Sequence, residues 1–175
     1  TLSETFTVSS LDGTTSQVTI TINGTNESAS VGLGSVQEDV TSTTGGVLTA
    51  TGGATFVPAT ITGTYGSLTI AADGTWAYNL NNADPAVQAL AAGQNVVEPT
   101  FTVTLSDGST TTVNISVTGT NDAAVISSGT GSVTEDMALS TSGTLTISDT
   151  DAGQSSFIAQ PATAGAYGSF TLNAA

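Results

Sequence analysis

The chain of 175 residues contains no lysine, arginine, histidine or cysteine, and only 8% of its residues are charged. All 14 charged residues are aspartate or glutamate, so the formal net charge is −14 at pH 7 with no internal cation to offset it. Affinity for phosphate groups depends on lysine and arginine. The composition therefore argues against nucleic-acid binding and against association with an anionic membrane surface.

The missing residue types also exclude several kinds of chemistry. Without histidine or cysteine, the chain can form no Ser-His-Asp triad, no cysteine nucleophile and no zinc or haem site of the usual kind. It can form no disulfide bond either. No apolar run approaches the roughly 18 residues of a membrane-spanning helix, so we predict no membrane insertion. The start, TLSETFTV, has neither a basic region nor an apolar stretch, so it does not resemble a signal peptide.

What the chain does contain is the residue pattern of β-strands. Hydrophobic residues make up 38% of the sequence, and threonine and serine fill much of the rest. Apolar residues alternate with polar ones over 68–70, 76–80, 101–105 and 113–117, and Asp-Gly pairs at 12–13, 73–74 and 107–108 predict hairpin turns. We predict an all-β fold whose core includes Phe56, Leu68, Trp76, Phe101 and Val103. One short helix is expected in 84–93, with Asp84 as N-cap, Pro85 in the first turn and Gly93 past the end.

The sequence repeats itself with a period of about 100 residues, which is typical of tandem β-sandwiches. TFTVSSLDGTTSQVTITINGTNESA (5–29) aligns with TFTVTLSDGSTTTVNISVTGTNDAA (100–124). GSVQED (34–39) aligns with GSVTED (131–136), and YGSLTI (65–70) with YGSFTL (167–172). We interpret 1–27 as the C-terminal strands of one repeat, 28–122 as a complete repeat, and 123–175 as the N-terminal part of the next.

Several of these segments together resemble the VCBS repeat of giant bacterial surface proteins and the cadherin-like repeats of RTX-type adhesins: GSVTED, TLTISDTDAG, YGSFTL, DGTWAYNL, FTVTLSDG and VTGTNDAAVI. The resemblance covers nearly the whole chain. It implies tandem Ig- or cadherin-like β-sandwiches in an extracellular or cell-surface protein that serves in adhesion, biofilm or fibre formation. In the cadherin-like branch, Ca2+ binds at the joints between neighbouring repeats.

Carried over residue by residue, the cadherin pattern implies one calcium site between 28–122 and 123–175. Its ligands would be Glu38, the linker residues Asn121 and Asp122, and the Asp-x-Asp pair Asp149 and Asp151. Carboxylate and amide oxygens are the ligands that Ca2+ prefers. Asp107 or Glu98 could contribute from a nearby loop.

The preceding joint has Asn26 and Glu27 in its linker, but TATGGA stands where the paired acids would be. We predict that this joint binds calcium weakly or not at all. Two alternatives stay open for the acidic residues. One is a local site within the third repeat, formed by Glu135 and Asp136 with Asp149 and Asp151. The other is that these residues are solvated loop carboxylates and turn formers.

The leading functional hypothesis is a structural one, a calcium-stiffened spacer or fibre segment. An alternative is a carbohydrate-binding module that uses an exposed aromatic such as Tyr65 or Tyr167, although aromatics are only 5% of the chain. A further alternative is a filament subunit in which 123–175 of one copy complements 1–24 of the next; against it stands the simpler view that the sequence is a stretch of a longer chain. We predict no enzyme, because a glycosidase needs two carboxylates facing a cleft, and Asp84 or Glu98 in sandwich loops would not provide one.

Overall fold

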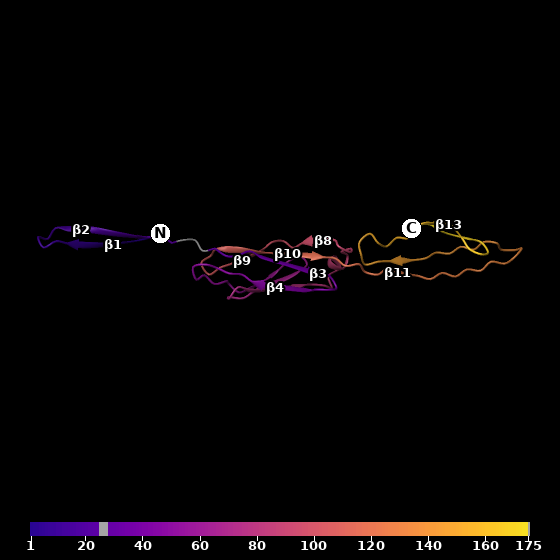
Figure 1. The fold of residues 1–175 in the computed structure, drawn as a ribbon, viewed down its shortest axis with the longest axis horizontal. Helices are drawn as coiled ribbons and strands as arrows, with labels where there is room; N and C mark the ends of the chain where they lie inside the picture. The colour runs from indigo at the N-terminus through magenta and orange to yellow at the C-terminus, as the bar shows by residue number, and fades with distance from the viewer. Residues whose placement is uncertain (25–27, 175) are drawn as a thin grey trace.

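The computed structural model describes residues 1–24 and 28–174. It confirms the prediction of an all-β chain: apart from one short helix, its regular elements are strands. Figure 1 shows the N-terminal hairpin, a central sandwich and the C-terminal segment following one another along the longest axis. In order, the elements are β1 (Leu2–Ser9), β2 (Thr15–Ile22), β3 (Gly32–Gln37), β4 (Thr43–Val47), β5 (Ala59–Thr62), β6 (Gly66–Ile70), β7 (Thr75–Leu80), α1 (Pro85–Gln88), β8 (Asn95–Val97), β9 (Phe101–Thr104), β10 (Thr110–Thr118), β11 (Val125–Ile126), β12 (Ile147–Ser148), β13 (Gln160–Ala164) and β14 (Ser169–Leu172).

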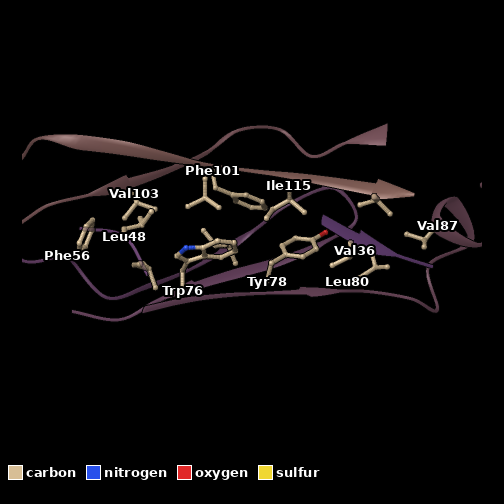
Figure 2. Close-up of a cluster of buried hydrophobic side chains, with 14 of the residues drawn as sticks. Val36, Leu48, Phe56, Trp76, Tyr78, Leu80, Val87, Phe101, Val103 and Ile115 are labelled. Atoms are coloured by element: carbon tan, nitrogen blue, oxygen red, sulfur yellow. The ribbon is translucent and has the colours of Figure 1, made fainter. Parts of the chain in front are cut away.

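Residues 28–122 fold as two sheets packed face to face. One sheet has the strand order β4-β7-β6-β5, and its neighbours are antiparallel. In the other, β10 pairs in parallel with β3 and antiparallel with β8 and β9. The apolar residues of both sheets meet between them (Figure 2), and all five predicted core residues, Phe56, Leu68, Trp76, Phe101 and Val103, are buried.

The turns follow the predicted chemistry. Gly13, Gly74 and Gly108 all have positive φ, and in each turn the preceding aspartate accepts a hydrogen bond from the backbone N–H two residues on. The helix is shorter than the pattern suggested, because α1 has only four residues. Its start is as predicted: Asp84 Oδ1 accepts from Ala86 N at 2.9 Å.

In the described parts of the flanking segments, strands form without a core comparable to that of the sandwich. In the hairpin β1–β2, every residue of both strands is exposed. The C-terminal segment forms the small strand pairs β11–β12 and β13–β14. Among the described residues, no helix is long and apolar enough to cross a membrane.

Candidate metal centre

Glu38 lies at the end of β3, and the structure buries it completely. Its backbone N–H donates to Thr118 O at 3.0 Å, and Thr120 Oγ1 donates to its carbonyl oxygen, also at 3.0 Å. The carboxylate oxygen Oε2 accepts a hydrogen bond from Thr120 N at 3.2 Å. These contacts fix the Glu38 side chain at the end of β10, where the chain leaves the sandwich.

The residue after Glu38, Asp39, lies in the turn that follows β3. Asp39 has a φ of 55°, a left-handed backbone conformation that residues other than glycine rarely adopt. A reciprocal pair of hydrogen bonds with Asn82 holds it there: Asp39 N donates to Asn82 Oδ1, and Asn82 Nδ2 donates to Asp39 Oδ1. The turn is therefore braced against the segment that precedes α1.

Asp151 reaches the same linker from the C-terminal segment and is 2% exposed. Its Oδ2 accepts hydrogen bonds from Asp122 N at 3.0 Å and from Gln154 Nε2 at 3.1 Å. The loop that carries it is closed by Asp149, whose Oδ1 accepts from Asp151 N at 2.9 Å. Asp149 thus acts as a turn former that orients Asp151.

A backbone contact also joins the two parts of the chain. Ala152 N donates to Ala89 O at 3.0 Å, and Ala89 is the C-cap of α1. The loop around Asp151 is therefore attached both to the linker and to the end of the helix. No side-chain pattern signals this contact, because it involves only backbone atoms of two alanines.

The electrostatics of the joint are unbalanced. Within the described residues, the buried oxygens Glu38 Oε1 and Asp151 Oδ1 accept no hydrogen bond. Burial raises the pKa of Glu38 above its ordinary value. The hydrogen bond from Thr120 N opposes this rise, and the negative charges of Asp122, Asp39 and Asp151 each add a smaller contribution in the same direction as burial. The sequence has no lysine, arginine or histidine to compensate. Such carboxylates are normally paired, protonated or bound to a metal.

These donors converge without forming a closed cluster. In the part of the chain that the structure describes, no group of three or more histidine, cysteine, aspartate or glutamate side chains is arranged to hold a metal ion. Ca2+ takes six to eight oxygens and accepts backbone carbonyls, amide oxygens and water besides carboxylates. Glu38 and Asp151 could therefore supply two carboxylates to a site whose other ligands are neutral.

The other predicted ligands lie in different settings. Asn121 is exposed, and its amide donates to Asp122 O at 2.5 Å. Glu135 and Asp136 occupy the exposed turn between Thr134 and Ala138. In this segment Val125 pairs with Ser148, and a Cβ on Gly131 would contact Thr141. The turn 134–138 is thus at the opposite end of the strand pair from Asp149, and the structure does not bring the alternative local site together.

Asp107 and Glu98 do not reach the joint. Asp107 Oδ1 accepts from the backbone N–H and the hydroxyl of Ser109 within its own hairpin turn. The Glu98 carboxylate is buried and fully occupied: it accepts from Thr64 N at 2.6 Å, Tyr65 N at 2.8 Å and Tyr78 Oη at 2.6 Å. Glu98 is a structural residue that the sequence did not distinguish from a candidate ligand.

For the preceding joint, Asn26 and Glu27 lie outside the described residues. The segment 47–54 that replaces the paired acids forms a turn in which Gly52 and Gly53 have positive φ. Of the two tyrosines considered for carbohydrate contact, Tyr65 is half-buried beside an open hollow of about 480 Å³, and Tyr167 is exposed in the C-terminal segment. They do not belong to one aromatic cluster.

The sequence was compared with known protein families and with curated proteins, and neither comparison finds a match.

Proposed function

We propose that this chain is a segment of a calcium-stiffened extracellular protein, in which Ca2+ joins the sandwich 28–122 to the segment that follows it. The observation that carries the proposal is the pair of buried, unpartnered oxygens, Glu38 Oε1 and Asp151 Oδ1. They come from two different parts of the chain. Both carboxylates are hydrogen-bonded to the same linker, through Thr120 N and Asp122 N.

The chemistry of the donors favours a hard divalent cation. Glu38, Asp122 and Asp151 offer only oxygen, and carbonyl and amide oxygens of the linker are available beside them. Because the sequence contains no basic side chain, a bound cation would be the compensating charge. A cation shared by both parts would fix their relative orientation. The protein would then act as a spacer or fibre segment whose partners are neighbouring repeats of the same kind, with a role in adhesion or biofilm.

The test is thermal unfolding followed in Ca2+ and in chelator at matched ionic strength. A ligand that binds only the folded state stabilises it by about 2.7 kcal/mol at 100 times its Kd. We expect Ca2+ to raise the Tm of the wild type and to leave the Tm of the Asp151→Asn variant almost unchanged. Asp136→Asn is the matched control, since it removes the same charge from an exposed turn and should retain the full calcium response. A wild-type Tm that does not respond to Ca2+ would contradict the proposal.

A further inference from the structure

The sandwich has a hollow on its outer surface, beside the turn that joins β5 to β6. Its volume is about 480 Å³, and its walls are the turn 62–66, the strands β6 and β7, and the segment that leads to α1. Ser67 and Asn79 are cross-strand neighbours in these strands. Because the residues that alternate with them are buried in the core, both side chains face outward.

Hydrogen bonds fix the turn that forms one wall of the hollow. The Tyr65 N–H donates to Glu98 Oε1 at 2.8 Å, and the Tyr65 carbonyl oxygen accepts from Asn81 N at 2.8 Å. A Cβ on Gly66 would collide with the carbonyl oxygen of Asn79, so the turn packs directly against β7. The wall is therefore held in place before a ligand binds, which reduces the entropic cost of binding.

The side chains around the hollow suit a neutral polar ligand. Asn79 and Asn81 are exposed, and both line the hollow together with the half-buried Tyr65. A side-chain amide offers a donor and an acceptor next to each other, which matches neighbouring hydroxyl groups of a sugar. An aromatic ring beside the amides offers an apolar surface to the C–H face of the same sugar. The combination is the chemistry of carbohydrate recognition.

The charge of the chain argues against the other common polar ligands. Among the described residues that line the hollow, Asp84 alone is charged, and its Oδ1 already accepts from Ala86 N at the start of α1. The sequence has no lysine, arginine or histidine and a net charge of −14. Phosphate, sulfate and uronate groups would therefore be repelled and would find no side chain to pair with.

We propose that this hollow binds neutral carbohydrate, with the Tyr65 ring against one face of a pyranose and the amides of Asn79 and Asn81 bonded to its hydroxyl groups. The volume lies within the roughly 300–1,000 Å³ of ligand sites. Because the hollow is open, it covers only part of a glycan, and we expect a Kd on the order of 1 mM. The site is separate from the proposed calcium site and shares no ligand with it.

Affinity electrophoresis tests the proposal, because it detects weak binding to soluble polysaccharides. The protein is run in native gels that contain chelator and one neutral polymer: hydroxyethyl cellulose, laminarin, galactomannan or dextran. Alginate is the anionic comparison. We expect at least one neutral polymer to slow the wild type and alginate to leave its mobility unchanged. The proposal is overturned if no neutral polymer slows the protein, or if alginate slows it equally.

Two substitutions test the residues of the hollow. Tyr65→Ala removes the ring and should raise the Kd for the retarding polymer about tenfold. Tyr65 also packs against the core, so its loss changes stability as well. Asn81→Ala avoids this, because it removes an exposed amide and keeps the N–H that donates to Tyr65 O; it should raise the Kd about fivefold. The Tm of each variant is measured in the same buffer.

Tyr167→Ala and Gln17→Ala are the matched controls, since they remove an exposed ring and an exposed amide outside the hollow. Both should keep the retardation of the wild type. An Asn81→Ala protein that is retarded as strongly as the wild type, or equal losses in Tyr167→Ala and Tyr65→Ala, would overturn the assignment to the hollow. Because the gels contain chelator, this outcome is independent of whether Ca2+ raises the Tm.

Discussion

Two buried glutamates of the same sandwich differ in how their charge is accommodated. Glu98 accepts three hydrogen bonds, and both of its oxygens are used. The carboxylate of Glu38 accepts one hydrogen bond, from Thr120 N to Oε2, and its Oε1 has no partner among the described residues. The typical cost of a buried polar atom without a partner is about 1–3 kcal/mol, and more for a charged group. Glu38 is therefore an intrinsic weakness of the sandwich unless a proton or a cation neutralises it.

This weakness predicts an unusual pH dependence in chelator. The ordinary pKa of Glu38 is 4.5, and the folded protein raises it. The folded state thus holds the proton more tightly than the unfolded chain, so this contribution is full below pH 4.5 and is lost as the pH rises through the folded pKa. Lowering the pH from 7 toward 4.5 should raise the unfolding free energy. The carboxylates of Asp12, Asp73 and Asp107 also contribute to stability, and this contribution is lost as the pH falls. The loss occurs only at lower pH, because their pKa values are lowered from 3.8.

Glu38→Gln isolates the effect. In chelator at pH 7 the variant should be more stable than the wild type by about 1 kcal/mol, since it removes a buried charge and keeps an acceptor for Thr120 N. It should also lose the rise in stability between pH 7 and 4.5 and the response to Ca2+. Glu135→Gln, at the matching exposed position, should shift stability by less than about 0.5 kcal/mol. Urea unfolding at several pH values measures both variants. A Glu38→Gln protein that is less stable than the wild type in chelator would argue for a purely structural role.

At the scale of elements, the loop 149–155 gives its two aspartates different roles. The spacing of Asp149 and Asp151 in the sequence does not distinguish these roles. The Asp-x-Asp pattern suggested two equivalent ligands, yet Asp149 uses an oxygen to hold Asp151 N. Which member of such a pair is buried depends on how the loop docks. Here the loop is held by the hydrogen bond from Asp122 N to Asp151 Oδ2 and by the backbone contact between Ala152 and Ala89, which no side-chain pattern encodes.

This division predicts different outcomes for two substitutions of Asp149. Asp149→Ala removes the acceptor for Asp151 N and should weaken Ca2+ binding about 10–100-fold, as is typical when a residue that orients a ligand is lost. Asp149→Asn keeps the acceptor oxygen and should largely restore affinity. Isothermal titration calorimetry of both variants is the measurement. If the asparagine variant loses as much affinity as the alanine variant, the charge of Asp149 contacts the ion directly.

The turn between β5 and β6 depends on Glu98 in a similar way. Its carboxylate accepts from the backbone of Thr64 and Tyr65 and from the Tyr78 hydroxyl, whose pKa is raised by burial and by this hydrogen bond. A Cβ on Gly63 would lie 2.6 Å from Glu98 Oε1, so only glycine lets the backbone at position 63 lie this close to the Glu98 carboxylate. The alternating strands and Asp-Gly turns were predictable from local sequence. This contact was not, because Glu98 and the turn are more than 30 residues apart.

We therefore expect Glu98→Ala to lower the unfolding free energy by about 3 kcal/mol, because it leaves the buried Tyr78 hydroxyl and two backbone N–H groups without an acceptor. Tyr78→Phe should cost less, about 1–2 kcal/mol, and the double variant should cost less than the sum of the two. Urea unfolding midpoints at constant m-value measure these changes. Additive costs would show that the two side chains are not coupled.

For the whole molecule, the uneven distribution of acids predicts uneven stiffness. The joint after the sandwich gathers Glu38, Asp122 and Asp151, whereas the segment 47–54 offers no carboxylate to the preceding joint. With a net charge of −14, any added salt reduces repulsion along the chain. A specific Ca2+ site should therefore stiffen the joint after the sandwich and leave the preceding joint unchanged. Screening would affect both.

Spin-label distances can separate these effects, because the chain has no native cysteine. The pair Thr69→Cys and Thr146→Cys spans the acidic joint, and the pair Thr7→Cys and Thr69→Cys spans the preceding one. We expect Ca2+ to narrow the distance distribution of the first pair and to leave the second unchanged, relative to Na+ at equal ionic strength. Adding Asp151→Asn should abolish the narrowing. Equal narrowing of the distance distributions of both pairs would mean that calcium acts by screening the acidic surface. That result would contradict a specific calcium site at the joint after the sandwich.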